Sequence, residues 1–236
     1  MSNPKLFRVI DYAVREYNLI EENDSILIGA SGGKDSTALA EYFSYRLGRR
    51  EKSAVRIEAL HVESGIGSPL NPEIAGYFRR WNIPLHTVSI SVTGRLKAGK
   101  SMNCWWCSTQ RRTELNEFAM REGFNKIALG HHMDDILETL LMNALFKGEL
   151  STMPPRLSYE KYPVTIIRPL CYADIPMIVR HAEARGYITS TCTCTYQDNS
   201  GRKDARSRLE ALTGGCYDMK RKLFESLKNI KPGYLP

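Results

Sequence analysis

A short glycine-containing loop between an apolar segment and a helix constrains the fold of this chain more than any other feature. Residues 25–29 are expected to form a short buried strand, and residues 36–47 have the apolar spacing of a helix. Between them lies the hexapeptide Ser31-Gly-Gly-Lys-Asp-Ser36. A strand that passes through a glycine loop into a helix is typical of the first unit of a nucleotide-binding α/β fold.

Strand and helix signals alternate along most of the chain. Further strands are expected at residues 54–62, 85–90, 126–129 and 164–167. Helices are expected at residues 5–20, 72–81, 108–122, 134–146 and 175–185, and a basic helical tail follows from residue 202. Repeated strand–helix units predict an α/β fold with a parallel sheet and helices on both faces. We expect residues 1–200 to form this domain and residues 201–236 a helical C-terminal extension, not an independent domain.

The composition fits an ordinary globular protein. The 236 residues are 42% hydrophobic and 25% charged, and no apolar run reaches the length needed to span a bilayer. The N-terminal segment has no secretory pattern, so we expect a cytoplasmic protein. The formal net charge of +7 is compatible with a polyanionic partner such as tRNA, although many soluble proteins are mildly basic.

The loop at residues 31–36 has the properties of a phosphate-binding site. Its two glycines let the backbone turn N–H groups toward an anion, and the following helix N-terminus adds partial positive charge. Lys34 can neutralise phosphate oxygens. The loop is not a Walker A motif, because Asp35 stands where that motif requires Ser or Thr, and a Rossmann Gly-x-Gly-x-x-Gly pattern is also missing.

A second polar segment, Gly130-His-His-Met-Asp-Asp135, follows the strand expected at residues 126–129. Carboxylates at this edge of a parallel sheet face the ligand crevice, and carboxylate oxygens suit Mg²⁺ bound to phosphates. We expect one of Asp134 and Asp135 to cap the helix and the other to bind the metal. His131 and His132 are either packing residues or catalytic ones, and the sequence favours packing.

Two cysteine clusters indicate a metal centre or catalysis, because disulfides are rare in a reducing compartment. Cys104 and Cys107 have a spacing that suits zinc, a redox dithiol or an iron–sulfur cluster equally, and Cys192 and Cys194 form the second cluster. Three thiolates would leave one iron of a four-iron cluster open to a small sulfur species. Trp105 and Trp106, which lie between the first two cysteines, either face a base or the cluster or belong to the core.

Taken together, these motifs resemble the tRNA 2-thiocytidine synthetase family of the PP-loop ATP pyrophosphatase superfamily. The resemblance also includes Arg111-Arg112, Met153-Pro-Pro155, Ile167-Arg-Pro-Leu170 and the ending at residues 228–235. These segments lie in family order and cover nearly the whole chain. The resemblance implies the PP-loop ATPase fold, related to the adenine nucleotide alpha hydrolases.

The resemblance further implies a tRNA thiolase that consumes ATP and Mg²⁺ and binds a [4Fe–4S] cluster through three cysteines. A cytidine O2 in the anticodon loop would attack the α-phosphate of ATP, and sulfur would then displace AMP from C2. The implied partners are tRNA, a sulfur donor (a cysteine desulfurase or sulfide) and a second copy of the chain in a homodimer.

The family pattern implies roles for individual residues. Those implied to contact the nucleotide are Ala30, Ser31, Gly32, Gly33, Lys34, Asp35, Ser36, His61, Gly130 and Asp135. Those implied to be catalytic are Lys34, Asp35, Arg111 and Asp134, and the implied metal ligands are Cys104, Cys107, Cys194 and Asp134. Cys194 is preferred to Cys192 because the spacing from it to Arg202 matches the family without a gap, although Thr195 and Tyr196 replace the family's Gly and Ser. Cys171 and Cys216 have no place in the pattern.

Several alternatives stay open at this point. Arg112 stabilises phosphate charge or contacts the tRNA backbone, and the basic tail either holds tRNA or is the solvent face of two helices. Rival activities are a thiouridine-, lysidine- or amide-forming enzyme that also adenylates its substrate. A rival of another class is a non-catalytic metal-binding RNA protein that keeps the nucleotide fold as a scaffold.

Overall fold

The architecture is a single six-stranded sheet with helices around it. The computed structural model describes residues 4–48, 55–67, 69–97, 99–159, 161–187 and 200–234, and within them the strand order is β3-β2-β1-β4-β6-β5. The strands are β1 (Ser25–Gly29), β2 (Arg56–Glu63), β3 (Leu85–Ser89), β4 (Lys126–Ala128), β5 (Arg156–Ser158) and β6 (Thr165–Ile167).

Neighbouring strands are parallel from β3 through β6, which confirms the predicted α/β fold with a parallel sheet. Strand β5 is the exception, because it pairs antiparallel with β6 at the edge of the sheet. It was not predicted. Its three residues are exposed or half-buried, so the sequence there has no apolar run that marks a strand.

The helices appear where the apolar spacing predicts them, with two important shifts. They are α1 (Lys5–Glu16), α2 (Lys34–Leu47), α3 (Pro72–Arg80), α4 (Cys104–Arg121), α5 (Met133–Lys147), α6 (Ile175–Arg185), α7 (Ser200–Thr213) and α8 (Tyr217–Ser226). Helix α2 begins at Lys34 and α4 begins at Cys104, both earlier than expected. In α4 the side chain of Asn103 accepts a hydrogen bond from the Trp106 N–H and so caps the helix at that point. The first cysteine pair therefore lies in a helical turn rather than in the preceding loop.

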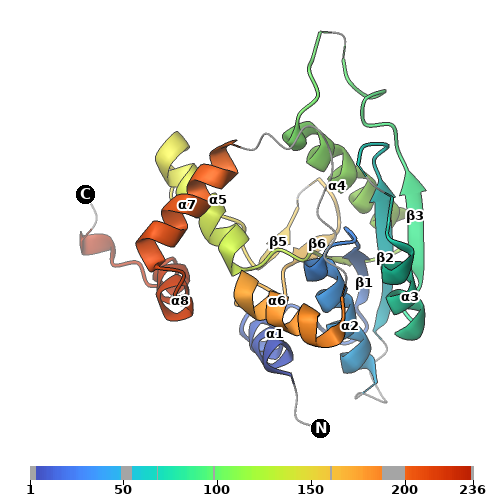
Figure 1. Cartoon of the computed structure of the whole chain (residues 1–236), viewed down its shortest axis with the longest axis horizontal. Coiled ribbons are helices and arrows are strands. Elements are labelled where there is room, and N and C mark those ends of the chain that lie inside the picture. The colour runs from blue at the N-terminus through green and yellow to red at the C-terminus, as the bar shows by residue number, and fades with distance from the viewer. Residues whose placement is uncertain are drawn as a thin grey trace.

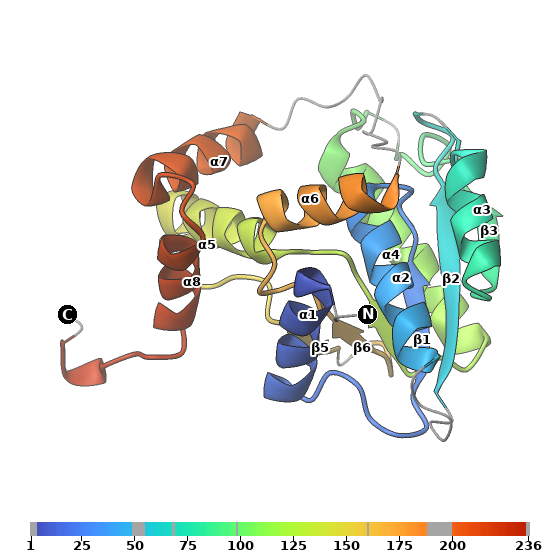
Figure 2. The same cartoon turned by 60° about the horizontal axis from the view of Figure 1, so that its bottom comes forward.

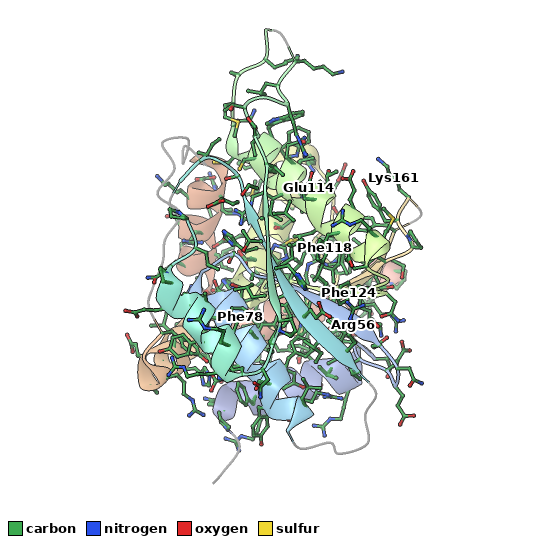
Figure 3. The ribbon with its side chains drawn as sticks, turned by 90° about the vertical axis from the view of Figure 1, so that its right-hand side faces the viewer. Arg56, Phe78, Glu114, Phe118, Phe124 and Lys161 are labelled. Atoms are coloured by element: carbon green, nitrogen blue, oxygen red, sulfur yellow. The ribbon has the colours of Figure 1, made fainter. Side chains whose placement is uncertain are left out.

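Apolar side chains pack against both faces of the sheet. One cluster contains Phe78 of α3 together with buried residues of α1, α2, α5 and α6. The other contains Phe118 of α4 and the nearby Phe124, and the guanidinium of Arg56 lies 4.1 Å from the centre of the Phe124 ring. Figure 3 shows Phe78 beside α3 and the two other phenylalanines across the strands from it. The sheet is thus buried on both faces, as a parallel sheet requires.

The last two helices pack against α5 rather than against the sheet. In both Figure 1 and Figure 2, α7 and α8 lie beside α5 on the side away from β2 and β3. A division of the chain at residue 200 stays a prediction. In the described parts of the chain, every helix is too short or too polar to cross a membrane.

The strand order reverses at β1, which sets the place of the site. From β1 the chain proceeds to β2 and β3 on one side of the sheet, and then to β4 and β6 on the other. Helices that leave adjacent strands in opposite directions open a crevice at the carboxyl ends of those strands. Here these strands are β1 and β4, which are followed by the loop at residues 30–33 and by residues 129–132.

Candidate active site

A cavity of about 780 Å³ occupies this crevice and is closed on one side by α4. The loop after β1 contributes Ala30, Ser31, Asp35 and Ser36 to its wall. The segment after β4 contributes Gly130, His131 and Asp135, and α4 contributes Cys104, Trp105, Arg111 and Arg112. The cavity thus brings together the glycine loop, one residue of the acidic pair and one cysteine of the first cluster, three features that are far apart in the sequence.

The start of α2 presents backbone donors that no side chain caps. Gly33 is the N-cap residue and makes no side-chain cap hydrogen bond. Gly32 has φ +83°, a conformation that favours glycine, and the Ser31 and Ser36 hydroxyls lie 3.1 Å apart across the loop. The first N–H groups of a helix carry partial positive charge, so this turn is a ready anion site.

Gly130 lets the two halves of the crevice approach each other closely. A Cβ atom at this position would lie 3.0 Å from the backbone nitrogen of Ser36 and 3.1 Å from the carbonyl carbon of Asp35. The β4–α5 segment therefore packs directly on the first turn of α2. A side chain here would separate the two walls.

The start of α5 is capped by its own side chains. The His132 ring accepts a hydrogen bond from the Asp135 N–H at 3.4 Å, and the Asp135 carboxylate accepts one from the His132 N–H at 3.2 Å. Burial raises the pKa of Asp135, but the neighbouring His132, His131 and Arg202 outweigh it and hold the pKa below its usual value. A carboxylate thus stays ionised at the cavity wall.

Asp134, expected to be catalytic and to bind magnesium, lies outside the cavity lining. Its side chain is buried, and one oxygen accepts a hydrogen bond from Lys220 Nζ at 2.7 Å. The other accepts one from the Ile175 N–H at 2.9 Å. Since Asp134 joins α8 and α6 to α5, its magnesium role does not fit the geometry. The expected division of labour between the two aspartates also changes, because Asp135 is both the capping residue and the one that faces the cavity.

Four of the predicted nucleotide contacts do not line the cavity, namely Gly32, Gly33, Lys34 and His61. The Lys34 ammonium lies 3.2 Å from the Asp35 carboxylate at the edge of the loop. His61 lies on the opposite face of β2, where it lines a separate groove under α3, and its Nδ1 is 2.7 Å from the Ala30 carbonyl oxygen. Burial is the main reason why the pKa of His61 is lowered. We infer that His61 stabilises the loop through this contact with Ala30, from the face of β2 that points away from the cavity.

The cavity carries more positive than negative charge. Four arginines line it, Arg111, Arg112, Arg168 and Arg202, against the carboxylates of Asp35 and Asp135. The last two arginines were not assigned to the site. Arg168 was visible only as part of the Ile167-Arg-Pro-Leu170 motif. Arg202 was grouped with the basic tail, because nothing in the local sequence shows that α7 returns to the crevice.

Arg168 is buried and orients His131. Its Nε donates to His131 Nδ1 at 3.3 Å, and its Nη1 donates to the Pro154 carbonyl. The pKa of His131 is lowered to about 4, mainly by burial and also by the positive charges of Arg168 and Arg202, which together outweigh the opposing effect of Asp135. The imidazole is therefore neutral at pH 7.

The first cysteine pair lies where α4 meets the cavity. Cys104 and Cys107 are half-buried in the first turn of α4, and Cys104 lines the cavity. Cys192 and Cys194 lie outside the described residues. Within the part of the chain that is described, no group of three or more His, Cys, Asp or Glu side chains is placed to hold a metal ion.

The two tryptophans between these cysteines have different roles. Trp105 is 69% exposed and lines the cavity, so its indole is free to stack on a base. Trp106 packs into the core, and its Nε1 donates to the Val92 carbonyl at 3.1 Å. Trp106 is therefore a core aromatic and Trp105 is not, and a role of Trp105 toward a base or a cluster stays a prediction.

Some of the remaining cysteines and of the basic residues in the tail are buried, and others are exposed. Cys171 is buried, which raises the pKa of its thiol to about 12, and Cys216 is exposed at the start of α8. In the tail, Lys220 is buried against Asp134, and Arg206 pairs with Glu138 at 2.7 Å. Lys203 and Lys222 are exposed.

Comparisons with known proteins found one family model and several relatives that match this chain. A family model described as the PP-loop domain matches residues 6–200. The chain is 34% identical to the tRNA-cytidine(32) 2-sulfurtransferase of Photobacterium profundum over 98% of this chain and 78% of that protein. It is 35% identical to the enzyme of the same name from Anaeromyxobacter dehalogenans over 98% of this chain and 81% of that one.

Two solved structures share the fold of this chain. The U34-tRNA thiolase NcsA from Methanococcus maripaludis, determined with its [4Fe-4S] cluster, superposes with a TM-score of 0.77 at 21% identity. The alignment covers 96% of this chain and 80% of NcsA. The NH3-dependent NAD synthetase of Campylobacter jejuni superposes with a TM-score of 0.53 at 13% identity over 97% of this chain and 88% of the synthetase. Identities this low establish the fold alone.

Proposed function

We propose that this chain, which belongs to the PP-loop family and within it to the family of tRNA-cytidine(32) 2-sulfurtransferases, replaces the O2 oxygen of cytidine 32 in tRNA with sulfur. The observation that carries the proposal is that Cys104 and the anion-binding turn at the start of α2 line the same cavity. Activation of the base and delivery of sulfur must occur at one carbon atom, so both functions have to be within reach of it.

ATP activates the oxygen that leaves. The uncapped N–H groups of α2 and the Ser31 and Ser36 hydroxyls hold the pyrophosphate end of ATP. The cytidine O2 attacks the α-phosphate, the bond from the α-phosphate to pyrophosphate breaks, and the adenylated base forms. Arg111, Arg112 and Arg168 stabilise the charge that develops on the phosphates. A carbonyl oxygen is a poor leaving group, whereas AMP is a good one.

Magnesium fits this cavity through Asp135. In nucleotide sites Mg²⁺ uses one or two protein carboxylates together with phosphate oxygens and water. Asp135 is ionised at the cavity wall and is opposite the first turn of α2. When bound, the ion would neutralise phosphate charge there. We assign this role to Asp135 rather than to Asp134, since both oxygens of Asp134 are held by Lys220 and Ile175.

The donor set also fits an iron–sulfur cluster. Cys104 and Cys107 lie one helical turn apart on α4, and we propose Cys194 as the third ligand. When bound, a [4Fe–4S] cluster on three thiolates would supply an iron position that accepts sulfur. The cysteines would hold that iron position at the wall of the cavity, where the base is adenylated.

The second half-reaction exchanges oxygen for sulfur. A sulfur nucleophile attacks C2 of the adenylated cytidine, the C2–O bond breaks, and AMP leaves with the original oxygen. The base must leave the anticodon-loop stack to reach C2, and the exposed indole of Trp105 offers a surface on which it can stack.

We further propose a cytoplasmic homodimer that receives its sulfur from a cysteine desulfurase or from sulfide. Leu145, Phe146 and Leu150 at the end of α5 are all more than half exposed. Apolar side chains that cluster on a surface are typical of a protein interface. A reducing compartment keeps the cysteines available for a cluster.

The test is tRNA thiolation in vitro. Anaerobically reconstituted protein is incubated with unmodified tRNA, ATP, Mg²⁺ and sulfide, and the nucleosides are analysed by mass spectrometry. We expect 2-thiocytidine and one AMP per modified base, and we expect neither with Cys104→Ala. The exposed Cys216 provides the matched control, since Cys216→Ala should retain both products. A thiouridine product, or colourless protein that binds zinc stoichiometrically, would contradict the proposal.

A further inference from the structure

Arg202 enters the nucleotide cavity from the C-terminal helices, whose basic residues the sequence leaves open as tRNA contacts or as a solvent face. It lies in the first turn of α7, and its side chain is part of the cavity lining. The glycine loop that faces it belongs to the first unit of the fold. The cavity wall is therefore completed by a residue from the far end of the chain.

The ionic contacts of α7 and α8 with α5 are not equivalent. Lys220 Nζ lies 2.7 Å from Asp134, and Arg206 Nε lies 2.7 Å from Glu138. Both are close hydrogen-bonded pairs that anchor a helix. The guanidinium of Arg202 lies between two carboxylates, 3.5 Å from Asp135 Oδ1 and 3.8 Å from Glu138 Oε2.

These longer distances mean that Arg202 contributes less to anchoring α7 than Arg206 does. Good hydrogen bonds from nitrogen to oxygen are about 2.7–3.2 Å long. The fully buried Glu138 accepts its short bond from Arg206 at Oε1, whereas its Oε2, 3.8 Å from Arg202, accepts no hydrogen bond from the described residues. The Arg202 donors are thus available to another anion at the cavity wall.

We propose that Arg202 is a nucleotide-binding residue that contacts the phosphate chain of ATP. The inference rests on the proposed function, because it takes ATP as the ligand. A cavity with four arginines and two carboxylates attracts a polyanion. The planar guanidinium presents several donors to phosphate oxygens. It lies 3.5 Å from Asp135, the carboxylate that we assign to magnesium, and is therefore next to the place where the phosphates would bind.

The experiment is equilibrium binding of ATP and of adenosine to the metal-reconstituted protein. Arg202→Gln should weaken ATP binding by at least about tenfold, the effect of losing a charge-assisted hydrogen bond, and leave adenosine binding unchanged. Arg202→Lys, which restores the charge, should recover part of the ATP affinity. Arg206→Gln is the matched control, since Arg206 shares Glu138 and α7 with Arg202 but does not line the cavity.

The outcomes separate this inference from the function it rests on. Equal ATP affinity in Arg202→Gln and wild type would overturn it, and so would an equal loss of ATP affinity in Arg206→Gln or a parallel loss of adenosine binding. If the wild-type protein binds ATP but produces no 2-thiocytidine, the proposed function fails while the assignment of Arg202 stands.

Discussion

Helices α2 and α5 begin at neighbouring positions in the crevice, yet their first turns are built in opposite ways. The start of α2 follows β1, has glycine as its N-cap residue and leaves its N–H groups without a side-chain cap. The start of α5 follows β4, and its His132 and Asp135 side chains satisfy the backbone groups reciprocally. One helix start therefore offers positive partial charge to a ligand, while the other offers a carboxylate.

The same contrast appears between adjacent residues of α5. Asp134 points toward the C-terminal helices and is buried with Lys220, whereas Asp135 points into the cavity. Successive residues of a helix face directions about 100° apart, so two neighbouring aspartates cannot serve the same site equally. One of them joins the helices of the fold and the other faces the cavity.

The largest expected effect comes from substituting Asp134, the buried aspartate of this pair. Asp134→Ala leaves the ammonium of Lys220 buried without its carboxylate, which should destabilise the protein by about 3–5 kcal/mol. Asp135→Ala removes a capping interaction and should cost only about 0.5–2 kcal/mol. Urea denaturation followed by circular dichroism measures both.

A double variant and an activity assay complete this test. Asp134→Leu combined with Lys220→Met replaces the ion pair with apolar side chains and should recover much of the lost stability. Asp135→Ala should abolish pyrophosphate release from ATP at a protein concentration where the fold is intact. A greater loss of stability in Asp135→Ala than in Asp134→Ala would mean that the two assignments are reversed.

The fold and the anion-binding turn could be predicted because their signals are local. Strand, glycine loop and helix follow one another within residues 25–47, and each element is recognised from its own spacing. The parallel sheet then follows from repetition of the same unit. The late strand β5 has no such signal, because it is a short edge strand with an exposed surface.

Cys104, Arg111, Arg112 and Gly130 also line the cavity as expected, but other parts of the site could not be predicted, because they depend on contacts between distant parts of the chain. Asp134 and Asp135 are indistinguishable until the positions of Lys220 and Arg202 are known. His61 lies in a segment whose apolar pattern predicts a strand, but the pattern does not show which face of that strand, β2, borders the cavity. The proposal that Cys194 is the third cysteine ligand still rests on the sequence alone, since Cys194 lies outside the described residues.

A smaller effect is expected where the two helix starts touch. In Gly130→Ala, the new Cβ would lie 3.0 Å from the Ser36 nitrogen, so the β4–α5 segment and the first turn of α2 must move apart. Overpacking of this kind costs about 1–3 kcal/mol, and the displaced N–H groups should bind ATP more weakly. Calorimetry of the variant with and without ATP measures both quantities.

Gly123→Ala is a useful control for that change. Gly123 has φ +71°, so alanine is strained there, but no atom lies within 4 Å of the added carbon. Its effect should be confined to stability, with ATP affinity retained. If Gly130→Ala binds ATP as tightly as the wild type, the close approach of the two helix starts has no role in the anion site.

The smallest effect concerns pH and the histidine beside the α5 start. The pKa of His131 is lowered from 6.5 to about 4, mainly by burial. Between pH 6.5 and 4 the unfolded protein therefore binds a proton that the folded protein does not, so the stability of the metal-free protein should fall as the pH decreases through this range. Because the ring is only half-buried, we expect a change on the order of 1 kcal/mol.

His131→Asn separates this contribution from the others. The amide oxygen of the introduced side chain can still accept the hydrogen bond from Arg168, but the amide does not titrate, so the fall in stability toward acidic pH should become shallower. His61, whose pKa is also lowered by burial, keeps part of the slope in the variant. Urea midpoints at several pH values measure the difference. An unchanged slope would mean that the pKa of His131 is not lowered in the folded protein. The ring would then be protonated below about pH 6.5, and at that pH the start of α5 would carry a positive charge beside Asp135 and would no longer contrast with the start of α2.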